Sequence, residues 1–173
     1  DGKLEIIICK KGELCVFNYN GTIKAGWPRN YTGKAPYNPA IGDIDGDGSG
    51  EIILNSFKQI NSFVDSGAVT VFRQNGDIFN SNWPLILDSN YISWSSSPSL
   101  YINESNSDLN FIAVVAGRII DGGAYGNHKF LKINVNGDII NQKYFQANRL
   151  PWEVVITSTT SATTPITVIC RPF

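Results

Sequence analysis

Short apolar runs rich in Ile, Val, Phe and Tyr alternate along the chain with clusters of Gly, Asn, Asp and Pro. No segment keeps the apolar period of an amphipathic helix, whereas short apolar runs bounded by turn residues are typical of β-strands. The clearest stretch predicts strands at 38–44, 51–55, 67–73 and 77–80, with an acidic loop between the first two. The pattern therefore predicts an all-β protein.

Three Asn-Gly pairs stand in the same local context, each between apolar residues: Asn20-Gly21, Asn75-Gly76 and Asn136-Gly137. Asn-Gly tolerates the positive φ angles that both central residues of a type I′ turn require, and the twist of this turn matches that of the flanking strands. Each pair therefore predicts a β-hairpin. The pairs recur after 55 and then 61 residues, which indicates a long internal repeat.

Other features recur in step with these turns. Trp27-Pro28 and Trp83-Pro84 follow the first two turns at nearly the same distance, which predicts a structural role for both tryptophans. A repeat of this length with about four short strands is typical of a β-propeller blade. We therefore expect residues 1–173 to form a single β-propeller segment built from four-stranded antiparallel sheets. The expected blades are a partial first at 1–30, a second at 38–87, a third at 95–146 and the start of a fourth at 152–173.

This number of blades predicts a partial or open propeller, because a closed ring contains roughly four to eight. The open edges of such a segment need a cover. Two ways of covering these edges remain possible: the remaining blades of a longer chain, or self-association of copies. We favour the longer chain.

One loop concentrates acidic side chains. Asp43, Asp45, Asp47 and Glu51 occupy its positions 1, 3, 5 and 9, with no Lys or Arg between them. Folded together without a counterion, these carboxylates would repel one another, and a hard divalent cation would remove that cost. Oxygen ligands favour calcium or magnesium over transition metals. With the backbone carbonyl of Ser49 at position 7 and with water, the loop can supply the about six to eight oxygens that calcium takes in irregular geometry.

The strongest competing interpretation of this loop is an EF-hand. Position 12 is Leu54 where an EF-hand needs a bidentate Glu, and the flanks are strand-like. A solvated acidic turn that binds nothing remains the alternative. The corresponding stretch of the third repeat, 102–110, lacks the first carboxylate and the glycines, so we expect no strong metal site there. The half-loop Asp1–Glu5 lacks its first ligands.

The segment Asn38–Leu54, with its loop Asp43-Ile44-Asp45-Gly46-Asp47-Gly48, resembles an FG-GAP/VCBS repeat, and residues 18–28 resemble the end of such a blade. These are the calcium-loop blades of integrin α-subunit propellers and of many bacterial surface or secreted proteins. The resemblance implies a calcium-binding module that acts in adhesion or in protein or glycan recognition. It also implies an extracellular, secreted or cell-surface setting.

The composition excludes two classes of partner. The chain has 14 basic and 15 acidic residues, so no basic field favours nucleic acid. The longest apolar run, 111–116, is far too short to span a bilayer. Cys9, Cys15 and Cys170 show no zinc-site spacing, and the first two are expected to be buried free thiols.

Three functions remain open, of which we favour a non-catalytic recognition module. Its candidate ligand contacts are aromatic residues in loop-like contexts, although packing in a blade core is the favoured interpretation of each. These residues are Tyr91, Trp94, Tyr125 and Trp152. The second function is part of a polysaccharide-degrading enzyme, but His128 is the only histidine and no nucleophile or dyad accompanies it. The third is a structural repeat in a surface assembly.

Overall fold

The computed structural model describes residues 3–35, 37–59, 64–88, 91–92, 97–118, 127–146, 153–157 and 167–171. Within these ranges the chain is all-β, with antiparallel strands and one short 3₁₀ turn, η1 (Ser107–Leu109). No helix in them has the length and hydrophobicity needed to cross a membrane. The predicted fold class is therefore confirmed at the level of strand content and sheet type.

The first two sheets are formed by the first seven strands. Sheet 1 has the order β1-β2-β3, and its strands are β1 (Ile6–Lys10), β2 (Glu13–Phe17) and β3 (Arg29–Asn30). Sheet 2 has the order β4-β5-β6-β7, and its strands are β4 (Ala40–Gly42), β5 (Glu51–Gln59), β6 (Val64–Phe72) and β7 (Leu85–Ile86). Sheet 2 is thus a four-stranded antiparallel meander.

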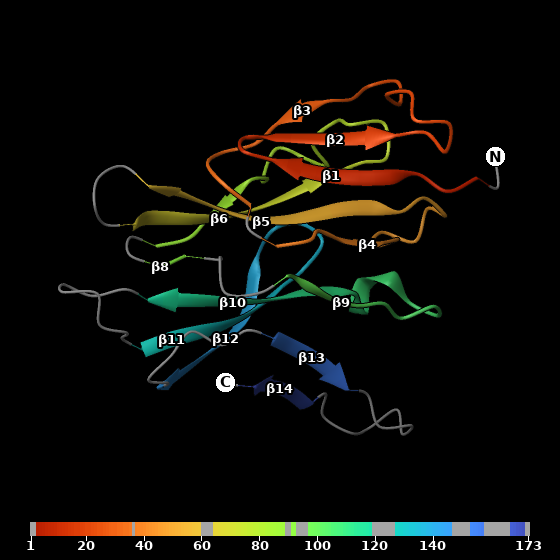
Figure 1. Ribbon diagram of the computed structural model, residues 1–173. Coiled ribbons are helices and arrows are strands. Elements are labelled where there is room, and N and C mark those ends of the chain that lie inside the picture. Colours follow the sequence, from red (N-terminus) through yellow and green to blue (C-terminus); the bar gives the residue numbers. More distant parts are fainter. Residues whose placement is uncertain are drawn as a thin grey trace.

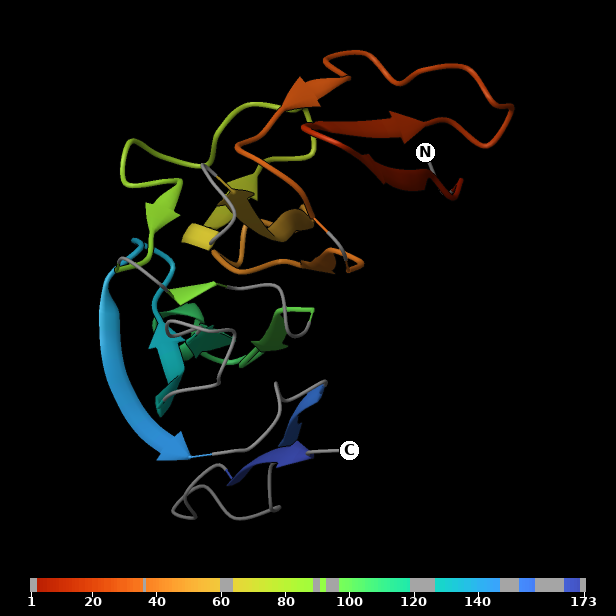
Figure 2. The same cartoon turned by 60° about the vertical axis from the view of Figure 1, so that its left-hand side comes forward.

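The second half of the chain forms a larger and a smaller sheet. Sheet 3 comprises β8 (Tyr91–Ile92), β9 (Ser99–Tyr101), β10 (Phe111–Arg118), β11 (Asn127–Ile133) and β12 (Ile139–Gln146), with both β8 and β9 paired to β10. Sheet 4 is the pair β13 (Glu153–Thr157) and β14 (Thr167–Arg171). The sheets follow one another in chain order from the red N-terminal end to the blue C-terminal end, as both views show (Figures 1 and 2).

The predicted strands of the second repeat agree with sheet 2 except for the last. Residues 77–80 do not form a strand, because only Ile78 bridges to Phe72. The chain then turns, with the Trp83 N–H donating to Asn80 O at 3.2 Å, and Trp83 enters the core. The fourth strand is instead β7, which pairs with β6 after the Trp-Pro segment.

All three Asn-Gly pairs lie in tight turns of the same kind, but the turns are not of the predicted type I′. In the first turn Gly21 N–H donates to Asn18 O at 2.9 Å and Asn18 N–H donates to Thr22 O at 2.8 Å. The loop therefore holds three residues, and its last is a glycine with φ of 82°. This is a type I turn followed by a left-handed glycine, for which Asn-Gly is equally suited.

Two buried apolar clusters join neighbouring sheets. The cluster between sheets 1 and 2 contains Leu14, Val16, Ile52, Leu54 and Phe72. The cluster between sheets 2 and 3 contains Ile53, Val69, Val71, Ile112 and Val114. Each face of sheet 2 is therefore covered by a different neighbour.

The repeated tryptophans close these two clusters in the same way. Trp27 Nε1 donates to Gln74 O at 3.1 Å, and Trp83 Nε1 donates to Val135 O at 3.3 Å. Each acceptor is the residue immediately before the next Asn-Gly pair. The predicted structural role of Trp27 and Trp83 is confirmed, since the two side chains are only 7% and 4% exposed.

Two of the three cysteines lie in the described part of sheet 1, and both are free thiols, as predicted. Cys15 is buried, whereas Cys9 is only partly buried.

A candidate metal centre in the β4–β5 loop

The loop between β4 and β5 is shaped by the carboxylate of Asp43. Its Oδ1 accepts the N–H groups of Gly46 at 2.7 Å and Asp47 at 3.1 Å, and its Oδ2 accepts that of Gly48 at 2.8 Å. Gly46 and Gly48 have φ of 79° and 86°, a conformation that side chains with a Cβ rarely adopt. The two glycines therefore let the backbone wrap around the first acid of the loop.

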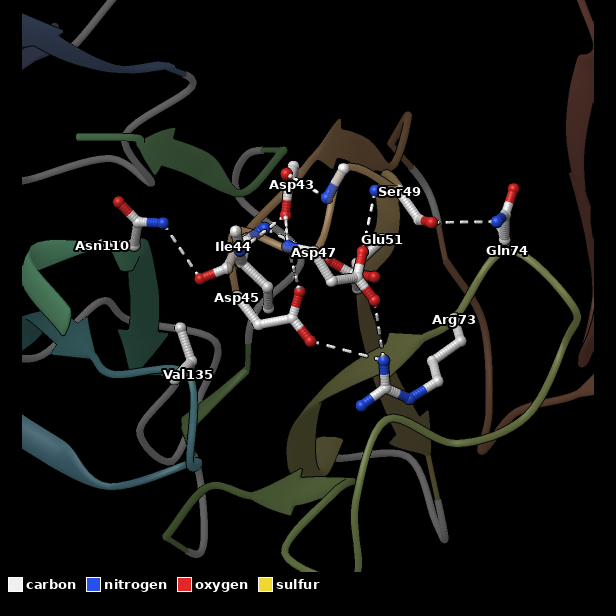
Figure 3. Close-up of polar contacts among 12 residues, drawn as sticks. Asp43, Ile44, Asp45, Asp47, Ser49, Glu51, Arg73, Gln74, Asn110 and Val135 are labelled. Atoms are coloured by element: carbon white, nitrogen blue, oxygen red, sulfur yellow. Dashed lines mark hydrogen bonds and ion pairs between the residues drawn. The ribbon is translucent and has the colours of Figure 1, made fainter. Parts of the chain in front are cut away.

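This wrapping brings three acidic side chains together. Asp43, Asp45 and Glu51 each offer a carboxylate oxygen, and these oxygens all lie within 4.8 Å of one another (Figure 3). Asp43 and Asp45 are partly exposed, whereas Glu51 is buried at the start of β5. The cluster is thus open to solvent on one side and closed by the sheet on the other.

Glu51 is the unusual member of the cluster. Its side chain is 1% exposed, and its Oε2 accepts the Ile44 N–H at 3.1 Å, while its Oε1 is buried with no hydrogen-bond partner. Burial, together with the negative charges of Asp45, Asp47 and Asp43, raises the pKa of this carboxyl to about 7. A buried acceptor without a donor is costly, and a cation beside it would remove the cost.

The other two predicted ligands lie differently. Asp47 is outside the three-acid cluster, and its Oδ1 accepts the Ser49 N–H at 2.7 Å. The Ser49 hydroxyl accepts a hydrogen bond from Gln74 Nε2 at 3.0 Å. The backbone carbonyl of Ser49, which the sequence suggests as a ligand, stays a prediction.

A basic residue far away in the sequence reaches the cluster. Arg73 Nη1 lies 3.3 Å from Asp45 Oδ2 and 3.7 Å from Asp47 Oδ2, and its guanidinium stacks 4.3 Å from the centre of the Phe79 ring. The sequence patterns do not predict this residue at the site. Arg73 does depart from the repeat, since it starts its Asn-Gly turn where the other two turns have Asn18 and Asn134, but this departure does not name Asp45 as its partner.

The loop is also tied to sheet 3. Asn110 is buried, and its Nδ2 donates to Ile44 O at 3.0 Å. The peptide groups of Ile44 therefore link Glu51 on one side with Asn110 on the other. In its own loop Asn110 repeats the role of Glu51, because its Oδ1 accepts the Asn103 N–H seven residues earlier.

Of the four aromatics predicted to contact a ligand, Tyr91 is the one that the structure describes. Tyr91 is 7% exposed, and its ring lies 4.2 Å from the ammonium of Lys129, which is paired with Asp88. It lines a small pocket together with Asp88, Lys129 and apolar side chains. Trp94, Tyr125 and Trp152 lie outside the described residues.

His128, the residue that the enzyme hypothesis requires, lies in β11. It is completely buried, and its Nδ1 accepts the Arg118 N–H at 3.1 Å. A buried ring nitrogen already engaged with the backbone does not offer a base to a substrate in this conformation.

No known protein-family model matches the chain, and no curated protein matches it.

Without metal, the contribution of Glu51 to the stability of the fold should fall as the pH rises towards neutrality. The folded-state pKa of Glu51 is raised from its ordinary value of 4.5 to about 7, so the folded state binds more protons than the unfolded state in this window. This contribution favours the fold fully below 4.5 and is lost as the pH approaches about 7. Urea unfolding in the presence of a chelator should show the decline in the wild type and a flatter profile in Glu51→Gln. Identical profiles would contradict the assignment.

Proposed function

We propose that the β4–β5 loop binds Ca²⁺ through the carboxylates of Asp43, Asp45 and Glu51, with Asp47 and Ser49 as further ligands. The observation that carries this proposal is the Glu51 carboxylate, which stands beside two other carboxylates and whose Oε1 is a buried acceptor without a donor. A turn that only faced solvent would have no reason to bury one of its acids this completely.

The balance of charge supports a divalent cation. The loop carries four carboxylates. Among the described residues, Arg73 is the one basic side chain that pairs with them. Their summed charge stays strongly negative after this pairing. All the candidate side-chain ligand atoms are oxygens. Carboxylate and backbone oxygens that approach a cation from one side suit the irregular coordination of calcium better than the strict octahedron of magnesium.

For the whole chain, we propose an open segment of an FG-GAP/VCBS-type β-propeller in an extracellular, secreted or cell-surface protein. The succession of antiparallel sheets, the meander of sheet 2 and the repeated tryptophan contact support blades of one kind. In this proposal calcium orders the connection between two strands of a blade, and the module recognises a protein or glycan ligand.

Isothermal titration of chelator-treated protein with CaCl₂ tests the metal site. A single site with stronger binding of calcium than of magnesium is expected, and Asp43→Asn should abolish it. Asp77→Asn is the matched control, because Asp77 is an exposed acid outside the cluster. Absence of calcium binding at millimolar concentration would remove the proposal.

Arg73→Gln should tighten calcium binding roughly three- to tenfold at low ionic strength, since it deletes a positive charge that competes for Asp45 and Asp47. The control is Arg29→Gln, which removes a partly exposed arginine that is paired with Asp77 and not with the acids of the loop. Titration calorimetry at two salt concentrations measures both variants. Weaker binding by Arg73→Gln would show that the guanidinium positions the ligands instead of competing with the metal.

A further inference from the structure

The junction of sheets 1 and 2 and the junction of sheets 2 and 3 repeat one contact. The tryptophan after one sheet's Asn-Gly turn donates its Nε1 to the carbonyl before the next sheet's Asn-Gly pair, at Gln74 O and at Val135 O. The Asn-Gly turn that accepts this hydrogen bond is called the accepting turn, and its glycine lies close to the segment that carries the tryptophan. A Cβ placed on Gly76 would lie 2.5 Å from Gly26 O, and one on Gly137 would lie 3.2 Å from Asn82 Cβ.

The accepting turns also sit on a buried cross-strand pair. Ile52 pairs with Phe72 in sheet 2, and Ile112 pairs with Ile133 in sheet 3, each directly before the turn. Their exposed fractions are 4% and 1% in sheet 2 and 0% for both residues in sheet 3. In sheet 2 the covering element includes Trp27, whose ring centre lies 5.7 Å from that of Phe72.

Sheet 1 has the same features, but no part of the chain that the structure describes covers them. Its cross-strand pair is Ile6 with Phe17, directly before the turn at 18–22, and Ile6 is 53% exposed. Ile8, on the same face of β1, is 43% exposed, whereas Leu54 at the matching position of β5 is completely buried. A Cβ on Gly21 would meet no atom within 4 Å. The acceptor that corresponds to Gln74 O and Val135 O is Tyr19 O.

We propose that this outer face of sheet 1, formed by Ile6, Ile8, Phe17 and the turn 18–22, binds a β-sheet element of another repeat that carries a Trp-Pro segment. The tryptophan ring covers Phe17, and its Nε1 donates to Tyr19 O. The contact continues the geometry of the two junctions already formed, and it covers apolar side chains that a surface rarely leaves exposed together. It involves none of the acidic residues of the β4–β5 loop.

The partner is a repeat from elsewhere and not a second copy of this chain. The sequence contains two Trp-Pro pairs, and both tryptophans already make the junction contact within the chain. A second copy would have to break one of these contacts to offer its tryptophan. A repeat with an unengaged Trp-Pro segment has no such cost.

The test uses the full chain labelled with ¹⁵N and a synthetic peptide with the sequence of residues 23–30, which contains Trp27-Pro28. NMR titration to millimolar peptide should shift the amides of residues 6–8 and 17–22. A peptide with Trp27→Phe, which keeps an aromatic ring but has no N–H donor, should bind roughly three- to tenfold more weakly. Ile6→Asp in the protein should abolish the shifts, and Ile86→Asp, at a residue 55% exposed outside this face, should leave them unchanged.

Three outcomes would overturn the proposal. One is the absence of shifts at residues 6–8 and 17–22, and another is an equal response to a peptide with Trp27→Ala. The third is concentration-dependent dimerisation of the free chain that Ile6→Asp abolishes, which would assign the face to a second copy. Calcium titration of the same samples reports on the β4–β5 loop independently, so failure of one proposal is distinguishable from failure of the other.

Discussion

Glu51→Gln is expected to abolish the stabilisation of the fold by calcium. In the wild type, calcium at a hundred times its dissociation constant stabilises the folded state by about 2.7 kcal/mol if it binds only that state. For a chain of this size this corresponds to a rise in melting temperature of about 5–10 °C. Gln keeps the shape of the side chain but removes the buried charge that draws the cation to Oε1. Thermal unfolding followed by circular dichroism, with CaCl₂ and with chelator, measures the difference.

The matched control for this experiment is Glu104→Gln, in the corresponding loop of the third repeat. Glu104 is exposed and belongs to no acidic cluster among the residues that the structure describes. It should respond to calcium like the wild type. In chelator, Glu51→Gln should be at least as stable as the wild type near neutral pH, because it removes a buried acid that lacks a partner. A calcium-dependent rise that survives in Glu51→Gln would contradict the assignment of this side chain.

Trp83→Ala should destabilise the protein by about 3–5 kcal/mol. The side chain is 4% exposed within the cluster that joins sheets 2 and 3, and its indole donates to Val135 O. The variant therefore leaves a large cavity and an unpaired carbonyl between two sheets. Equilibrium unfolding in urea measures the change in the free energy of unfolding.

Two further variants separate the parts of this effect. Trp83→Phe keeps most of the ring but loses the hydrogen bond, and a cost of about 1–2 kcal/mol is expected. Tyr19→Ala, at an aromatic residue 60% exposed, should change stability by no more than about 0.5 kcal/mol. If Trp83→Ala cost no more than Tyr19→Ala, the tryptophan contact would not hold the sheets together.

Local features of the sequence predict most of sheet 2 and the outline of the site. Short apolar runs between turn residues predict strands β4, β5 and β6. The spacing of the acids, together with Gly46 and Gly48, predicts the acidic site in the β4–β5 loop. These signals lie within a few residues of the structure that they determine. The predicted strand at 77–80 is wrong because it is inferred from local propensity alone. The Trp-Pro segment that displaces it acts through packing in the core.

The contacts around the loop could not be predicted in this way. Arg73 lies 28 residues beyond Asp45, and Asn110 lies 66 residues beyond Ile44. Neither pairing has a local pattern, since each depends on how one sheet packs against the next. The burial of Glu51 could not be predicted either. Its position in the loop marks it as a candidate ligand but says nothing about how far solvent reaches the side chain.

The sequence by itself determines an all-β chain, its long repeat, its three Asn-Gly turns and a loop with acids at fixed spacing, because strand period, turn preference and charge spacing are local properties. The packing of the sheets decides the rest. It leaves Glu51 Oε1 buried without a donor, brings Arg73 to Asp45 and covers the apolar pairs of sheets 2 and 3 while leaving Ile6 of sheet 1 exposed. These differences arise between residues far apart in the chain, where only the three-dimensional arrangement sets distance, burial and charge.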